Sequence, residues 1–131
     1  MPAMEMYHDK DPAETIRNKI GDLSNFQIMS NQVLIGVYER PQMTKSGIHL
    51  ADTTRGEDRN QGKAGLVLKK GPKAFVSDAN YTFAEDENVE VGDWVAIFVS
   101  DGRQIVINKQ LCRLVEDQYI RLKIPAPDSV Y

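Results

Sequence analysis

Two spacings of apolar residues follow one another along the chain. In residues 11–23, DPAETIRNKIGDL, isoleucine and leucine recur at helical spacing on one face. Asp11 suits the N-cap of such a helix, and Pro12 suits its first position. The segment is therefore predicted to form a short amphipathic helix within an N-terminal extension, residues 1–30.

From residue 31 onward the spacing is that of β-strands. Residues 31–39, NQVLIGVYE, are rich in β-branched side chains and carry apolar residues on both faces. This pattern predicts a strand that is buried on both sides. Gly36 lies inside the segment, where it suits a bulge or the sharp bend of a barrel corner.

Further short strands are predicted in the second half of the chain. GLVLKKGP is followed by NVEVGDWVAIFVSDGRQIVIN, which predicts two strands joined by a tight hairpin at Asp101 and Gly102. QLCRLVE and QYIRLKI add two more, and apolar and basic residues alternate in the last one. One helix and many short strands predict an all-β fold, a compact β-barrel or sandwich formed by residues 31–124. Residues 125–131, PAPDSVY, are expected to be a mobile tail.

Size and composition favour one soluble domain. A chain of 131 residues is long enough to bury a core without disulfides or metals. Its 16 basic and 19 acidic residues are interspersed, so no basic stripe indicates a nucleic-acid partner. The longest wholly apolar run, residues 94–99, is too short to span a membrane. The single cysteine suits a reducing compartment, by default the cytoplasm.

The reactive side chains form no pattern typical of a catalytic or metal site. In GEDRNQGKA, five residues separate the two glycines and Ala64 follows Lys63, whereas a phosphate-binding loop needs four residues there and a Ser or Thr after the lysine. His8 and His49 have no second ligand at the spacing of a zinc or iron site. Cys112 lies in an apolar strand pattern, so it is interpreted as a buried core residue. The sequence thus predicts no enzymatic activity, no cofactor and no metal.

One long polar stretch, residues 40–64, separates the first two strands. Loops longer than about 12 to 15 residues are uncommon in compact domains and are usually functional or disordered. Ile48 and Leu50 project to the same side of an extended chain, while His49 faces the other way. With Gly47 permitting a turn before them, the two aliphatic side chains are predicted to anchor a partner. Alternatively, they fold back as a strand on the barrel or lie singly on the surface.

Taken in order, several segments resemble the GroES-type co-chaperonins, the lid subunits of the large ring-shaped chaperonin. These segments are NQVLIGVYE, TKSGIHL, GLVLKKGP, VGDWVAIF and YIRLKI. The resemblance covers residues 31–124. Its most specific part is residues 44–50, which look like the family's mobile loop with its glycine-hydrophobic tripeptide. The turn VGD, residues 91–93, is a less specific match.

The resemblance implies an irregular GroES-like β-barrel assembled into a heptameric dome without enzymatic activity. Its mobile loops would dock on the apical domains of an ATP-loaded GroEL-type chaperonin and close the chamber over a non-native polypeptide. ATP hydrolysis would belong to the chaperonin. The resemblance assigns chaperonin binding to Gly47, Ile48, His49 and Leu50. The last strand would pair with the first strand of the neighbouring subunit, which assigns the interface to Val33, Leu34, Ile35, Val37, Tyr119, Ile120, Leu122 and Ile124.

The sequence departs from the family pattern in several places. His49 stands where a β-branched aliphatic residue is usual, which implies a reduced or tuned loop affinity. The long loop and the N-terminal extension suit a bacteriophage version of the family. Residues 72–88, with FVSDANYTF at their centre, are expected to form either the hairpin that roofs the dome or part of its wall.

Two other functions fit the same predicted elements. The first is a stand-alone GroES-like barrel domain of an enzyme, similar to the catalytic domain of zinc alcohol dehydrogenases, although the cysteine and histidine ligands of such a zinc site are missing. The second is a structural protein, for instance of a phage particle, whose loop contacts a sister subunit.

Overall fold

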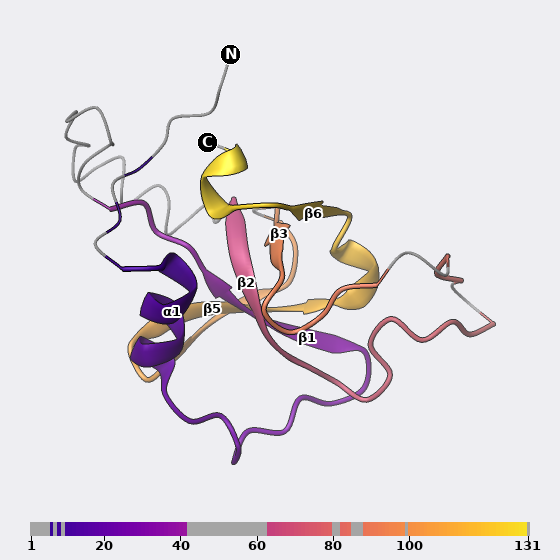
Figure 1. Cartoon of the computed structure of the whole chain (residues 1–131). Helices are drawn as coiled ribbons and strands as arrows, with labels where there is room; N and C mark the ends of the chain where they lie inside the picture. The colour runs from indigo at the N-terminus through magenta and orange to yellow at the C-terminus, as the bar shows by residue number, and fades with distance from the viewer. Residues whose placement is uncertain are drawn as a thin grey trace.

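The computed structural model describes residues 6, 8, 10–41, 63–79, 82–84, 88–98 and 100–130 (Figure 1). In this part of the chain, no helix has both the length and the apolar character needed to cross a membrane. The α-helix is α1, Pro12–Ile20. The strands are β1 (Gln32–Val37), β2 (Ala64–Lys70), β3 (Trp94–Ala96), β4 (Arg103–Ile107), β5 (Gln110–Glu116) and β6 (Leu122–Ile124).

The strands form one antiparallel sheet in the order β4-β5-β1-β2-β3-β6. The predicted all-β class with a short N-terminal helix is therefore confirmed. Among the described residues no ladder joins β4 to β6, so hydrogen bonding does not close this sheet into a barrel. As a consequence, β4 and β6 form the two edges of the sheet and β1 lies inside it.

The predicted helix is present and is shorter than the segment 11–23. Oδ1 of Asp11 accepts a hydrogen bond from the backbone N–H of Ala13 (3.4 Å), and Pro12 opens the helix. The helix ends before Gly21, whose φ of +74° is a conformation that favours glycine. Its buried face packs against β2 and β5, at the left of the view in Figure 1.

β1 is buried on both faces, as its sequence predicts. On one face Leu34 packs with Ile20 of α1, Ile107 and Cys112. Cys112 is fully buried there, which confirms its interpretation as a core residue. The opposite face contributes to the largest core cluster, which consists of Val33, Ile35, Val37, Val67, Val89, Val95, Ile97 and Val115.

Gly36 serves the close approach of α1 rather than a bend of the strand. The register between β1 and β2 shifts between Leu34 and Ile35, so the irregularity lies before the glycine. A Cβ atom at position 36 would lie only 2.6 Å from Cγ2 of Ile16. The missing side chain therefore leaves room for the helix to lie on the sheet.

The hairpin predicted at Asp101 and Gly102 is wrong. β3 pairs with β2 and β6, whereas β4 pairs with β5, so the strands on either side of this dipeptide lie in opposite parts of the sheet. The tight hairpin instead joins β4 to β5 through Asn108 and Lys109, whose φ angles are +50° and +69°. Positive φ at both central residues is the conformation of a type I′ turn.

The C-terminal part is less regular than predicted. Instead of one strand over QYIRLKI, Asp117–Tyr119 forms a short 3-10 helix and only Leu122–Ile124 forms β6. The residues expected to be a mobile tail include a second 3-10 helix, Pro127–Val130, which packs against β2, β3 and β6. It lies above β6 in Figure 1. The tail prediction is therefore wrong for this helix, and Asp128 supplies the physical reason, as described below.

Candidate functional site

The long polar stretch begins and ends at one place on the sheet. The backbone N–H of Tyr38 donates to the carbonyl oxygen of Ala64 (3.0 Å), just beyond the last paired residues of β1 and β2. We call residues 38–41 and 63–64 the loop root. Because β1 and β2 are antiparallel neighbours, the chain before residue 42 and the chain after residue 62 meet at this root.

The predicted chaperonin-binding residues lie outside the described part of the chain. They are Gly47, Ile48, His49 and Leu50, all within residues 42–62. Their role as anchors for a partner stays a prediction.

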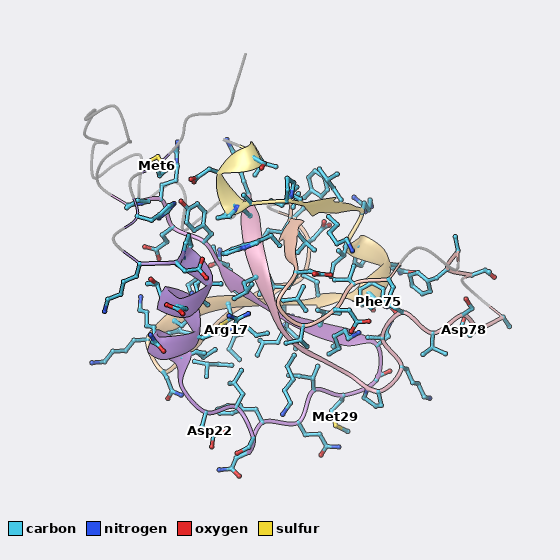
Figure 2. The ribbon with its side chains drawn as sticks, in the orientation of Figure 1. Met6, Arg17, Asp22, Met29, Phe75 and Asp78 are labelled. Atoms are coloured by element: carbon cyan, nitrogen blue, oxygen red, sulfur yellow. The ribbon has the colours of Figure 1, made fainter. Side chains whose placement is uncertain are left out.

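Three polar side chains meet at the loop root. The hydroxyl of Tyr38 donates to Oδ1 of Asp128 (2.6 Å) and lies 3.2 Å from Nε2 of His8. The same histidine nitrogen lies 3.1 Å from Oδ2 of Asp128, which also accepts the backbone N–H of Met6 (3.3 Å). We call His8, Tyr38 and Asp128 the root cluster. It ties the N-terminal segment, which includes Met6 (labelled in Figure 2), to the residue after β1 and to the last 3-10 helix.

The root cluster is largely shielded from solvent. Tyr38 is 3% exposed, and the side chains of His8 and Asp128 are 22% and 17% exposed. The Tyr38 ring packs edge-on against Trp94, with ring centroids 5.9 Å apart. Tyr38 also belongs to a small apolar cluster with Ala64 and residues of β3 and β6. The arrangement is that of a structural connection between chain segments rather than of an open reaction centre.

Sequence reasoning missed the root cluster because its members are far apart along the chain. No spacing links residues 8, 38 and 128, and from the sequence alone His8 was considered only as a metal ligand. The described residues contain no group of three His, Cys, Asp or Glu side chains that could hold a metal ion. One usable signal is Tyr38 itself, because a tyrosine at the end of a buried strand needs a hydrogen-bond partner for its hydroxyl.

The predicted subunit interface is wrong for the first strand. β1 is hydrogen-bonded to β5 on one side and to β2 on the other, so it has no free edge for the strand of a neighbour. The four predicted interface residues in β1 are at most 1% exposed, namely Val33, Leu34, Ile35 and Val37. These side chains stabilise the core of their own chain.

The second half of the predicted interface lies at an open edge of the sheet. β6 pairs with β3 on one side and ends the strand order. Leu122 and Tyr119 are 50% and 37% exposed, whereas Ile120 is partly buried and Ile124 is buried. A contact with another subunit at this edge stays a prediction, and Leu122 and Tyr119 are the residues exposed to form it.

An aromatic and basic patch surrounds this edge. The guanidinium of Arg121 lies over the rings of Phe98 (5.5 Å) and Tyr119 (5.6 Å). Phe98 is 46% exposed, and Leu122 extends the apolar surface. We call Phe98, Tyr119, Arg121 and Leu122 the edge patch. Aromatic residues and arginine are enriched at protein interfaces, so the patch has the composition of a contact surface.

Arg113 fixes the segment that carries Phe98. Its side chain is buried in β5 and donates hydrogen bonds to the carbonyl oxygens of Phe98 (2.7 Å) and Asp101 (3.2 Å). Burial lowers the pKa of the guanidinium, and the nearby Asp101 opposes that shift. The arginine thus serves the fold and holds one side of the edge patch in place.

Cys112 lacks the properties of a nucleophile. Its thiol is buried, and burial raises the pKa to about 11. Because the thiolate is the reactive form, the thiol is unreactive near neutral pH.

A depression of about 580 Å³ lies beside the 3-10 helix at residues 117–119. Asp117, which is 4% exposed, accepts hydrogen bonds from the N–H of Phe75 (2.8 Å) and the side-chain amide of Asn31 (3.2 Å). Both carboxylate oxygens therefore hold the surrounding segments together. The lining is mostly polar and consists of Ser30, Asn31, Lys73, Val76, Asp78, Phe83, Asp117 and Gln118.

The predicted roof segment is described only in part. Oγ of Ser77 accepts the N–H of Phe83 (2.9 Å), and the rings of Phe75 and Phe83 pack edge to face with centroids 5.6 Å apart. These contacts bring Phe83 next to Phe75 and Ser77. A place in the roof or the wall of a dome stays a prediction.

No family model and no curated protein matches the sequence. The GroES-type resemblance thus rests on the order of the strand segments and on the motif at residues 44–50.

Proposed function

We propose that this chain is a subunit of a co-chaperonin, which caps an ATP-loaded chaperonin ring through its loops. The motif at residues 44–50 and the order of the strand segments support the proposal. An antiparallel sheet with the loop between two adjacent strands is compatible with it. The observation that carries the proposal is the loop root.

The loop root means that residues 42–62 are not needed to span a distance across the fold. The bond between Tyr38 and Ala64 already closes their base. A stretch of polar residues that returns to its starting point is free to serve a second molecule. Counted from Pro41, the chain is long enough for Ile48 to reach up to about 25 Å from the root.

Energetics favour several copies acting together. Burying two large aliphatic side chains contributes roughly 3 to 6 kcal/mol. Ordering a segment on binding costs about 2 to 5 kcal/mol, so one loop alone would bind weakly. Linked copies on a symmetric ring raise the overall affinity by roughly 10² to 10⁴ when their geometry matches the partner. A heptameric lid on a heptameric chaperonin ring satisfies this condition.

The oligomer interface is proposed at the edge patch of β6 instead of at β1. As its partner on the next subunit we propose the segment just before β1, where Phe26 and Met29 are 40% and 62% exposed. Met29 lies at the lower rim of the molecule in Figure 2. A contact between two different surfaces is head-to-tail and generates a ring when its rotation closes.

Ile48→Asp tests the loop anchor, with Thr53→Asp as a matched control in the same segment. Wild type and control are expected to co-elute with a GroEL-type chaperonin in the presence of ATP, whereas Ile48→Asp is expected to elute alone with its oligomeric size unchanged. Equal binding by both variants would refute the anchor assignment.

Leu122→Asp tests the interface, with Val106→Asp as a control on the opposite edge strand. Val106 is 62% exposed on β4, so both changes add one charge to an edge. Light scattering is expected to show a ring for the control and a smaller species for Leu122→Asp. A ring for Leu122→Asp and a smaller species for Val106→Asp would instead place the interface at β4.

Size also separates this function from its rivals. A monomer that does not bind a chaperonin would favour the stand-alone barrel domain of an enzyme. A ring or filament that does not bind the chaperonin, either with or without ATP, would favour a structural protein.

A further inference from the structure

The hydrogen atoms of the root cluster can be assigned from its geometry. A tyrosine hydroxyl has one hydrogen, and the 2.6 Å contact to Oδ1 of Asp128 uses it. At 3.2 Å from the same hydroxyl, Nε2 of His8 must therefore be the donor. This N–H also faces Oδ2 of Asp128 at 3.1 Å. Asp128 thus accepts hydrogen bonds from the side chain of Tyr38, which follows β1, from the side chain of His8 and from the backbone N–H of Met6.

The cluster joins segments that lie outside the six strands of the sheet. Met6 is fully buried, and its N–H donates to Asp128 (3.3 Å). Asp128 itself lies in the last 3-10 helix, beyond β6. The cluster therefore pins both ends of the described chain to one tyrosine.

Tyr38 is also part of the loop root. Its backbone N–H donates to Ala64 (3.0 Å), and its ring packs on Trp94. A movement of Tyr38 therefore affects two sets of contacts at once. One is the contact of its hydroxyl with Asp128 and His8, and the other is its backbone hydrogen bond to Ala64 at the loop root.

We propose that the root cluster is a clamp that couples the docking of residues 6 and 8 of the N-terminal segment to the position of the loop root. The coupling to a partner rests on the proposed function of residues 42–62 as a binding loop. Because coupling between two sites is reciprocal, binding at the loop tightens the hold on residues 6 and 8, and release of those residues weakens binding at the loop by the same factor.

Tyr38→Phe is the sharpest test, because it removes one hydroxyl and keeps the ring against Trp94. Amide hydrogen exchange is measured on the full chain without any partner. The amides of residues 6 and 38 are expected to exchange about tenfold faster, since opening of the clamp is a local event that costs less than global unfolding. Amides in the centre of β5, such as that of Val115, are expected to keep their rates.

Two further variants make the result specific. Asp128→Asn keeps the shape of the side chain and is expected to accelerate exchange at the same two amides. Thr15→Val removes a hydroxyl from an exposed residue of α1, outside the cluster, and is expected to change neither. Unchanged exchange at residues 6 and 38 in Tyr38→Phe, or equal acceleration throughout the sheet, would overturn the clamp.

The coupling is then tested with the chaperonin and ATP. Tyr38→Phe and Asp128→Asn are expected to bind about threefold to tenfold more weakly than wild type, while Thr15→Val binds as wild type. In wild type, binding is expected to slow exchange at residue 6. If wild type does not bind, the proposed function fails, and the exchange data still decide whether the clamp exists. If wild type binds and both clamp variants bind equally well, the coupling is refuted.

Discussion

β1 and β6 are both predicted from apolar residues, yet they occupy opposite situations in the sheet. β1 has apolar residues at consecutive positions, is paired along both edges and is buried on both faces. In β6 apolar and basic residues alternate, one edge is open, and Leu122 is 50% exposed. In these two strands, the consecutive apolar run accompanies burial inside the sheet and the alternation accompanies an open edge.

The largest effect is expected from a charge placed in β1. Ile35 is fully buried in the main core, so Ile35→Asp would place a carboxylate among buried apolar side chains. The cost is comparable to the whole free energy of unfolding of a typical domain, about 5 to 15 kcal/mol. Circular dichroism and size exclusion are expected to show an unfolded or aggregated chain. A cooperatively folded Ile35→Asp would contradict the placement of β1.

A smaller loss is expected from one added methyl group next to β1. A Cβ at Gly65 of β2 would lie 2.2 Å from Cγ2 of Ile35 and 3.1 Å from the carbonyl oxygen of Gly36. Gly65→Ala is therefore expected to lower the free energy of unfolding by about 1 to 3 kcal/mol. Urea denaturation measures the change, and an unaltered midpoint would show that the two strands do not approach so closely.

The pH dependence of stability tests the burial of β5 beside β1. Burial raises the pKa of Cys112 from 9.0 to about 11, so the folded state holds this proton more tightly than the unfolded chain. As the pH rises between these values, the unfolded state loses the proton first and the free energy of unfolding falls. The slope from this group is up to about 1.4 kcal/mol per pH unit. Cys112→Ala should remove this part of the slope, and identical curves for both proteins would contradict the burial.

The smallest effect on stability is expected at the edge strand. Leu122→Asp places a charge on a half-exposed residue, so the free energy of unfolding of the isolated subunit is expected to change by about 0.5 kcal/mol or less. Thermal unfolding at concentrations below assembly measures this value. If Leu122→Asp lowered the free energy of unfolding as much as Ile35→Asp, β6 would have to be as deeply buried as β1.

Local signals in the sequence were sufficient for α1 and for β1. Asp11 and Pro12 act on their own helix, and the two-sided apolar run of β1 needs no knowledge of its partners. The tight turn was missed because Asn108 and Lys109 lack the glycine that is usual at such positions. Asp101-Gly102 carried the stronger signal, and Gly102 does have a positive φ (+68°), but the strands on either side of it do not pair. A Cβ at Gly102 would lie 2.4 Å from the carbonyl oxygen of Leu114, so this glycine allows a close approach to β5.

Two features could not be predicted from the sequence because they depend on which strands and segments meet in the folded chain. The choice of β1 as an interface strand followed from the resemblance to co-chaperonins, which does not reveal that both edges of β1 are occupied in this chain. The root cluster joins residues 8, 38 and 128 through contacts that only the folded chain creates. Both features arise from long-range pairing, which leaves no trace in the spacing of neighbouring residues.

The pairing of β1 with β5 has a consequence for synthesis of the chain. Gln32 faces Glu116 across this ladder, so β1 emerges from the ribosome long before one of its two partners exists. During that interval the apolar side chains on both faces of β1 cannot be buried as they are in the folded chain. The nascent chain is therefore expected to bind chaperones that shield apolar segments until residue 116 has left the ribosomal exit tunnel.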